Sequence, residues 1–276
     1  MTITAGIDVG STYTKAVLLN ESNEILARHM VQTGFKLADA ARRCYNAILE
    51  NSGIREDQVE YIIATGFGRH QVDFKDLHVT DLTASARGAY LLFPGTRSIL
   101  DVGGQTMKAI RVEEGGMVKS FRLNDKCAAG TGAFLEKTAR YMGYKTEDIG
   151  PLLQTSLDPV EISGVCAVFA ESEVINQLSL GTPPSEIMQG AIESLTGRAV
   201  QLMKRVKGEP EYTLIGGIMR FPTMPKAVRE RTKGITVNLP GEDANDADLP
   251  QFVTALGAAF LGHRRLEKLA AEKAAT

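Results

Sequence analysis

Short apolar runs separated by glycine mark the N-terminal part of the chain. Residues 3–9 form one such run, which ends at Gly10, and a second run covers 14–19. Two strand-like runs on either side of a glycine turn are typical of a β-hairpin. Apolar positions over 36–51 then recur at the spacing of a helix, and 61–66 has the pattern of a buried strand that enters a glycine-rich loop.

The same order of elements starts again near residue 97. Leu-Asp-Val-Gly at 100–103 repeats Ile-Asp-Val-Gly at 7–10, and a strand-like run over 106–112 follows the second copy as 14–19 follows the first. Internal repeats decide the architecture of a chain. The pattern therefore predicts a duplication.

The duplication predicts an α/β protein with two related domains. The first domain is expected over 1–95, joined by a C-terminal helix within 252–276, and the second over 96–251. Other segments also have regular periodicity: helices are predicted at 132–142, 167–180, 186–206 and 252–271, a strand that enters a loop at 212–217, and a surface loop at 239–250.

The composition narrows the classes of function. The 276 residues carry 31 Lys and Arg against 33 Asp and Glu, a net charge of -2 with no block of like charges, so no nucleic-acid partner is expected. No apolar stretch approaches the roughly 20 residues of a membrane-spanning helix, and no charged and apolar leader is present. We expect a cytoplasmic protein with no membrane partner.

The 3 cysteines do not suit a disulfide framework.

Both glycine turns offer chemistry for a phosphate group. Glycine lets backbone N–H groups approach phosphate closely, as Gly10-Ser11-Thr12 and Gly103-Gly104-Gln105 would. Asp8 and Asp101 precede these turns and could hold a magnesium ion through its water ligands. One such turn is a common hairpin device, but two of them, followed by Gly216-Gly217, favour nucleotide binding. The lack of a Gly-x-x-x-x-Gly-Lys-Ser/Thr sequence argues against a P-loop.

This order resembles the acetate and sugar kinase, Hsp70 and actin superfamily over nearly the whole chain. The resemblance implies an actin-like ATPase fold, in which two duplicated domains surround an ATP cleft. It implies that Lys15, Gln105 and Gly130-Thr131-Gly132 lie near the nucleotide, and that Gly216-Gly217 contacts the adenosine. A lysine on a strand is otherwise most often solvated. The residues after the second glycine, Ile-Met-Arg-Phe-Pro, depart from the small residues usual there.

Two of the cysteines stand just before helix-like patterns. Cys127 is followed by small residues and a helix pattern, and Cys166 directly precedes another. The dipole and free N–H groups of a helix start favour a thiolate. Two thiolates cannot complete a four-cysteine iron-sulfur site, so such a site requires a second copy or a homologous subunit. The alternative is that both are small buried residues beside helix ends.

The sequences around these cysteines favour the first alternative. Lys-Cys-Ala-Ala-Gly-Thr-Gly at 126–132 and Cys-Ala-Val-Phe-Ala-Glu-Ser-Glu-Val-Ile at 166–175 closely resemble the BadF/BadG/BcrA/BcrD ATPase family. That family includes activators of 2-hydroxyacyl-CoA dehydratases and ATPase subunits of benzoyl-CoA reductase. The resemblance implies one [4Fe-4S] cluster shared between two subunits and held by Cys127 and Cys166 of each. Cys44 matches no motif of the family and is expected to be a buried helix residue.

The resemblance also implies a mechanism. ATP closes the cleft between the turns at Asp8 and Asp101, closure turns the helices after the two cysteines, and one electron passes to a partner at very low potential. Glu171, with Glu173 near it, is a candidate for placing magnesium or the attacking water. The alternative role for Glu171 is a carboxylate that satisfies the dipole at a helix N-terminus.

The expected function is that of an ATP-dependent electron activator, with ferredoxin or flavodoxin as electron donor and acyl-CoA reductase or dehydratase subunits as partners. Similarity at 1–8 and 34–38 favours an ATPase subunit of benzoyl-CoA reductase. The first alternative is a homodimeric activator of a 2-hydroxyacyl-CoA dehydratase. A small-molecule kinase of the same fold, or a sensor that binds nucleotide without hydrolysing it, is an alternative from another class.

Overall fold

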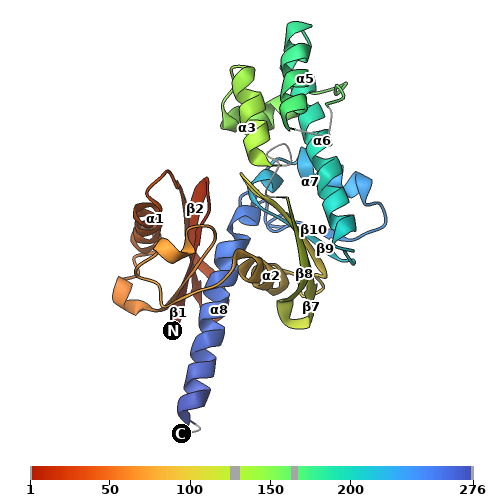
Figure 1. Ribbon diagram of the computed structural model, residues 1–276. Helices are drawn as coiled ribbons and strands as arrows, with labels where there is room; N and C mark the ends of the chain where they lie inside the picture. Colours follow the sequence, from red (N-terminus) through yellow and green to blue (C-terminus); the bar gives the residue numbers. More distant parts are fainter. Residues whose placement is uncertain (1, 125–130, 163–166, 275–276) are drawn as a thin grey trace. The chain divides into compact units, whose positions relative to one another are not determined.

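The chain builds two mixed five-stranded sheets with the same strand order (Figure 1). One sheet has the order β3-β2-β1-β4-β5, and the other β8-β7-β6-β9-β10. The central strands β1 and β6 each pair antiparallel with the next strand in sequence, and parallel with β4 and β9, respectively. The predicted duplication is therefore present in the backbone topology.

The computed structural model describes residues 2–124, 131–162 and 167–274. Among these residues, no helix has both the length and the apolar character needed to cross a membrane. The chain divides into two units: unit 1 comprises Met1–Gly95, Glu113–Val118 and Phe252–Thr276, and unit 2 comprises Thr96–Val112 and Lys119–Gln251.

The first sheet and its helices come from both ends of the chain. Its strands are β1 (Ile3–Val9), β2 (Tyr13–Asn20), β3 (Ile25–Gln32), β4 (Val59–Thr65) and β5 (Leu77–His78). Its helices are α1 (Leu37–Ser52), α2 (Asp81–Leu92) and α8 (Leu249–Ala274).

The second sheet is accompanied by more helices. Its strands are β6 (Ser98–Val102), β7 (Met107–Glu113), β8 (Met117–Asn124), β9 (Tyr212–Ile215) and β10 (Val237–Asn238). The helices are α3 (Gly132–Tyr141), α4 (Ile149–Leu153), α5 (Ala167–Ser179), α6 (Pro184–Arg205) and α7 (Thr223–Arg231).

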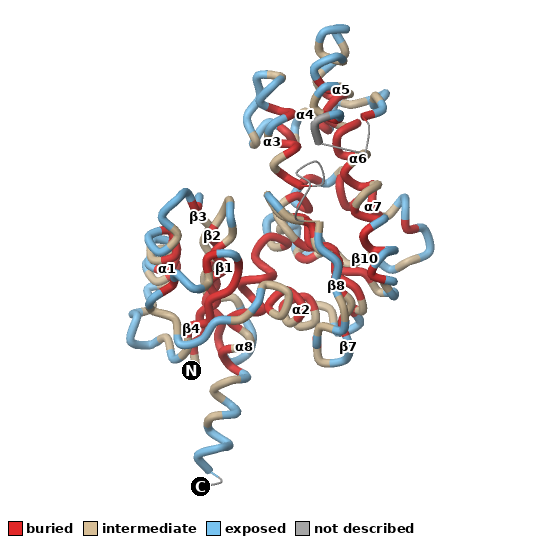
Figure 2. Tube along the Cα trace, in the orientation of Figure 1, coloured by how far each residue is buried: buried red, intermediate tan, exposed pale blue. Residues whose placement is uncertain are grey.

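The first sheet is covered on both faces. Alternate residues of β1 and β2 pack with Tyr45 and Ile48 of α1, while Val17 and Leu19 of β2 pack with α8 on the other face. Side chains of a strand point to opposite faces in turn, so one strand serves two cores. The first half of α8 is buried against the sheet and its C-terminal turns are exposed (Figure 2).

Glycine and a threonine allow α8 to lie close to β1. A Cβ at Gly6 would lie 1.9 Å from the carbonyl oxygen of Ala255, so no larger residue fits there. The hydroxyl of Thr4 donates to the carbonyl oxygen of Ala259 at 2.8 Å. The helix therefore completes the core of unit 1.

The core of unit 2 forms around α6, which buries Ile192 and Leu195 among residues of α3, α4, α5, α7 and the sheet. Burial of apolar surface at this density supplies most of the free energy that favours folding. The helices predicted at 132–142, 167–180, 186–206 and 252–271 are confirmed as α3, α5, α6 and α8, although α6 and α8 begin two to three residues earlier.

Candidate functional site

In unit 1, the turn between β1 and β2 carries a paired carboxylate and ammonium. Asp8 and Lys15 face each other across the two strands, and Nζ of Lys15 lies 3.5 Å from Oδ2 of Asp8. Both side chains are largely buried. The N–H of Gly10 donates to the carbonyl oxygen of Tyr13 at 3.2 Å and closes the turn, while Ser11 is exposed at its tip. We call this the Asp8 turn.

The end of β4 completes the surroundings of Asp8. Gly66 has a φ of 84°, and a Cβ there would lie 2.4 Å from Oδ1 of Asp8. Only glycine fits this conformation and this distance. The hydroxyl of Thr65, the neighbour of Asp8 in the parallel pair, is buried without a hydrogen-bond partner in the described structure. A buried hydroxyl without a partner favours a polar ligand at this place.

In unit 2, the turn between β6 and β7 repeats this geometry. Asp101 faces Lys108 across the strands, and Nζ of Lys108 lies 3.0 Å from Oδ2 of Asp101. The N–H of Gly103 donates to the carbonyl oxygen of Thr106 at 2.9 Å, and Gln105 is exposed at the tip. We call this the Asp101 turn.

Gly216 occupies beside Asp101 the place that Gly66 has beside Asp8. Its φ is 99°, and a Cβ there would lie 2.7 Å from Oδ1 of Asp101 and 2.4 Å from the carbonyl oxygen of Val102. Gly217, the next residue, begins a short 3₁₀ helix. Four of the predicted residues of unit 2, Asp101, Gly103, Gly104 and Gly216, thus lie together with Lys108.

Two of these site residues, Lys108 and Gly66, are not indicated by the motifs of the sequence. The signal for both lies in the repeat: Lys15 follows Asp8, and Lys108 follows Asp101, at the same place on the returning strand. Gly66 ends the strand beside the first aspartate, as Gly216 ends the strand beside the second. Comparing the two copies of the repeat position by position therefore identifies both residues.

The start of α3 lies on the Asp101 turn. The N–H of Gly132 donates to the carbonyl oxygen of Gly103 at 3.0 Å, and Thr131 before it is fully buried. The structure thus brings Thr131 and Gly132 to the Asp101 turn, and their place near a nucleotide stays a prediction. Gly130 lies outside the described residues.

Glu171 lies on α5, and its carboxylate faces α3. It accepts hydrogen bonds from Nζ of Lys137 at 2.6 Å and from the hydroxyl of Tyr141 at 3.4 Å. The bond to Glu171 is the main reason that the pKa of Lys137 lies above its ordinary value. A role for Glu171 at magnesium or at the attacking water stays a prediction.

The two cysteines expected to hold a cluster, Cys127 and Cys166, lie outside the described residues. Within the described part of the chain, no three His, Cys, Asp or Glu side chains converge as metal ligands. Cys44 is buried in α1, where its thiol donates to the carbonyl oxygen of His29 at 3.2 Å, which confirms the expectation for this residue. Burial raises its pKa to about 12, so the thiol is neutral and unreactive near pH 7.

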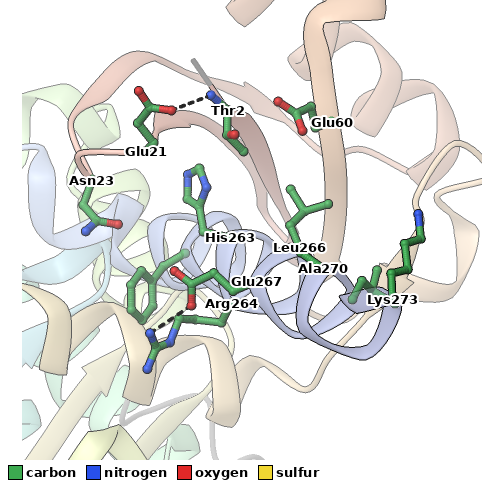
Figure 3. Close-up of a pocket in the computed structure, with 12 residues that line it drawn as sticks. Thr2, Glu21, Asn23, Glu60, His263, Arg264, Leu266, Glu267, Ala270 and Lys273 are labelled. Carbon is green, nitrogen blue, oxygen red and sulfur yellow. Dashed lines mark hydrogen bonds and ion pairs between the residues drawn. The ribbon is translucent and has the colours of Figure 1, made fainter. Parts of the chain in front are cut away.

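A hollow of about 610 Å³ in unit 1 lies away from the Asp8 turn (Figure 3). It is lined by Thr2, Glu60, His263 and neighbouring residues of α8. Thr2 precedes β1 and Asp8 is near its other end, so at roughly 3.3 Å per residue the two are about 20 Å apart. The hollow is therefore too far from the Asp8 turn to take part in chemistry at that turn.

These features define a class of protein. Two duplicated mixed sheets, each with an aspartate and a glycine turn at its centre, form the actin-like ATPase fold. A glucokinase of the ROK family from Streptomyces griseus shares this fold with a TM-score of 0.56 over 95% of this chain and 99% of that one, at 15% identity. At that identity, the likeness shows the fold alone.

The family follows from closer matches. Residues 5–262 match the model of the BadF/BadG/BcrA/BcrD ATPase family, and the chain belongs to that family. It is 37% identical to an activator of lactoyl-CoA dehydratase from Anaerotignum propionicum, over 96% of this chain and 99% of the relative. It is 36% identical to a subunit of benzoyl-CoA reductase from Thauera aromatica, over 98% of this chain and 96% of that subunit.

A solved structure of a relative is also similar. The activator of 2-hydroxyisocaproyl-CoA dehydratase from Clostridium difficile, solved with bound ADPNP, matches with a TM-score of 0.88 at 31% identity, and the match covers 98% of each chain.

Proposed function

We propose that this protein is an ATP-dependent electron activator, which couples ATP hydrolysis to the transfer of one electron at low potential to a partner reductase. The observation that carries the proposal is the pair of matching turns, in which Asp8 and Asp101 are each braced by a lysine and each lie against a glycine. Membership of an ATPase family supports the same function.

The residues of the two turns fit a nucleotide with magnesium. Carboxylate oxygens are the ligands that Mg²⁺ prefers, and it keeps several waters, so Asp8 and Asp101 would hold it through water. The turns Gly10-Ser11-Thr12 and Gly103-Gly104-Gln105 would donate to phosphate oxygens through the N–H groups of their second and third residues, because the N–H groups of Gly10 and Gly103 already donate within the turns. Lys15 would reach the phosphates, because its ammonium lies beside Gly10: a Cβ on that glycine would be 3.7 Å from Nζ.

The other residues proposed for the nucleotide belong to unit 2. Gly130-Thr131-Gly132 would approach the phosphates from the start of α3, which is bonded to the Asp101 turn. Gly216 and Gly217 would pass beneath the adenosine, where the lack of side chains leaves space.

The proposed second cofactor is a [4Fe-4S] cluster bridging two subunits, with Cys127 and Cys166 of each as ligands. Its support is the resemblance of the sequences around both cysteines, and the start of α5 at the residue after Cys166. When bound, the cluster supplies a one-electron carrier whose potential depends on its hydrogen bonds and its exposure. The protein's part is to hold the ligands and change their surroundings.

The partner proposed first is an acyl-CoA reductase of the benzoyl-CoA reductase type, with ferredoxin or flavodoxin as electron donor. The 36% identity to a benzoyl-CoA reductase subunit supports it. The 37% identity to an activator of lactoyl-CoA dehydratase supports a second candidate, a homodimeric activator of a 2-hydroxyacyl-CoA dehydratase. A reductase component would be needed in equal amount with its partner, whereas an activator would act in small amounts.

The first experiment is an anaerobic preparation assayed for iron, acid-labile sulfide and ATP hydrolysis. About four irons per two chains are expected from a bridging [4Fe-4S] cluster, and Cys127→Ser and Cys166→Ser should each lose them. Cys44→Ala is the matched control and should keep the iron, because Cys44 is buried in α1. An iron-free protein that hydrolyses ATP only when a small hydroxyl or carboxyl compound is added would contradict the proposal and support a kinase.

A further inference from the structure

The Asp101 turn is bonded directly to the first residues of α3. The N–H groups of Gly132 and Ala133 donate to the carbonyl oxygens of Gly103 and Gly104 at 3.0 and 2.7 Å. The turn and the start of α3 are in close contact, because a Cβ at Gly132 would lie 3.3 Å from the Cα of Gly104. A displacement of the turn therefore displaces the start of α3.

Further along α3, two side chains hold one carboxylate of α5. Lys137 and Tyr141 are four residues apart and lie on one face of α3. Both donate to Oε2 of Glu171, at 2.6 and 3.4 Å. We call these three side chains the α3–α5 clasp.

The clasp adds a directional hydrogen bond to the apolar contact between α3 and α5. Phe134 and Leu135 of α3 and Ala170 and Val174 of α5 belong to one buried cluster, and apolar burial is not directional. A charge-assisted hydrogen bond is directional and short. The pair is also partly solvated, with side-chain exposures of 48% for Lys137 and 22% for Glu171, and such pairs contribute little to stability. Removing the clasp should therefore leave the fold intact.

We propose that Glu171 is a positioning residue: the clasp carries a displacement of the Asp101 turn through α3 to α5, so that the bound nucleotide sets the orientation of α5. This inference rests on the proposed function, in which Cys166 is a cluster ligand. Because α5 begins at the next residue, its rotation acts on that ligand through one peptide bond. Glu171 then serves α3 rather than magnesium or the attacking water.

The test compares amide hydrogen exchange of the anaerobic holoprotein with ADP and with a non-hydrolysable ATP analogue. In the wild type, the exchange of α5 amides should differ between the two nucleotides. In Lys137→Met, this difference should shrink at least about fivefold, whereas the difference at the first turn of α3 and the rate of ATP hydrolysis should stay within about twofold. In Glu171→Gln the α5 difference should shrink by a similar factor, because the same hydrogen bond is weakened.

Two controls make the result specific. Glu242→Gln removes another ion pair of unit 2, between Glu242 and Arg229 at 2.6 Å, and should leave the α5 difference unchanged. The charge-swapped variant Lys137→Glu with Glu171→Lys should restore it.

Three outcomes would overturn the role proposed for the clasp. They are an unchanged α5 difference in Lys137→Met, no α5 difference in the wild type, and a loss of ATP hydrolysis in Glu171→Gln that Lys137→Met does not share. The last would assign Glu171 to the reaction itself. A wild type that binds neither iron nor nucleotide contradicts the proposed function instead, and this is measured before any variant is made.

Discussion

The Asp8 turn and the Asp101 turn are built alike but anchored differently. In unit 1, the hydroxyl of Thr33 donates to the carbonyl oxygen of Gly10 at 2.8 Å, so the turn is fastened to the loop after β3 of its own sheet. In unit 2, the corresponding carbonyl, that of Gly103, accepts from Gly132 at the start of α3. The Asp8 turn is therefore fastened within its own sheet, whereas the Asp101 turn is bonded to α3, the helix that follows Cys127 along the chain.

The lysines of the two turns differ as well. Nζ of Lys108 lies 3.0 Å from Asp101, whereas Nζ of Lys15 lies 3.5 Å from Asp8 and beside Gly10. The lysine is closer to its aspartate in unit 2, and in unit 1 it also faces the turn where phosphate would lie. Substitutions in the two turns can test whether this difference matters.

The largest effect is expected from the aspartates. Asp8→Asn and Asp101→Asn should each lower kcat for ATP hydrolysis about 10²- to 10³-fold, because a neutral amide supports magnesium far less well than a carboxylate. Steady-state ATPase rates, with circular dichroism to check folding, measure this. If only one variant loses activity, the two turns do not share the ion.

Alanine at the two glycines beside the aspartates should destabilise the units. Gly66→Ala and Gly216→Ala place a Cβ within 2.7 Å of an aspartate oxygen at positive φ, so a loss of about 2–4 kcal/mol is expected. The matched controls are Gly34→Ala and Gly181→Ala, where φ is also positive but nothing lies within 4 Å; these should lose only about 1 kcal/mol. Urea denaturation measures the difference, and equal losses at all four sites would contradict the close contacts.

The lysines should separate binding from turnover. Lys15→Met should raise the KM for ATP about tenfold with little change in kcat, and Lys108→Met should lower kcat by a similar factor, about 1.4 kcal/mol in each case. Initial rates at a range of ATP and magnesium concentrations decide this. If both variants change KM and kcat alike, the difference in anchoring has no functional meaning.

The smallest effect concerns Cys44, which lies behind the Asp8 turn, with its thiol 3.5 Å from the carbonyl oxygen of Thr14. Its pKa is raised from 9.0 to about 12 by burial, so the unfolded chain loses the proton first as pH rises. The raised pKa of Cys44 therefore contributes fully to the free energy of unfolding below pH 9, and this contribution is lost between about pH 9 and 12. In the native protein at about pH 8, below the ordinary pKa of a thiol, a maleimide should leave Cys44 unmodified by mass spectrometry, and rapid modification would contradict its burial.

Much of the fold could be predicted because its signals are local. Apolar runs ending at Gly10 and Gly103 identified both hairpins, and helical periodicity identified α1, α3, α5, α6 and α8. The pattern predicts no element at 25–32, 81–92 or 223–231, where the structure has β3, α2 and α7. In β3 every residue is partly exposed except the last, which is exposed, and no apolar run therefore marks it.

The missing parts depend on contacts between distant residues. Helix α2 is rich in small residues because it packs closely on α8, where a Cβ at Gly88 would lie 2.1 Å from the carbonyl oxygen of Val253. Small residues give weak periodicity. Likewise, the pairing of Glu171 with Lys137 joins two helices far apart in sequence, and no spacing rule indicates it. The aspartates and glycines of the two turns were predictable because each turn is a single hairpin, whereas Lys108 and Gly66 are indicated only by comparing the two copies of the repeat.

The place of α8 late in the chain has a consequence for synthesis. The strands β1 and β2 are made early, yet Gly6, Val17 and Leu19 pack against residues that come only from Phe252 onward. On the ribosome, unit 2 is therefore complete before unit 1, and domains fold as units once they are available. A premature stop codon that removed the residues from Phe252 onward would release a chain with unit 2 complete and the first sheet uncovered on one face, which is the kind of surface that chaperones and proteases act on.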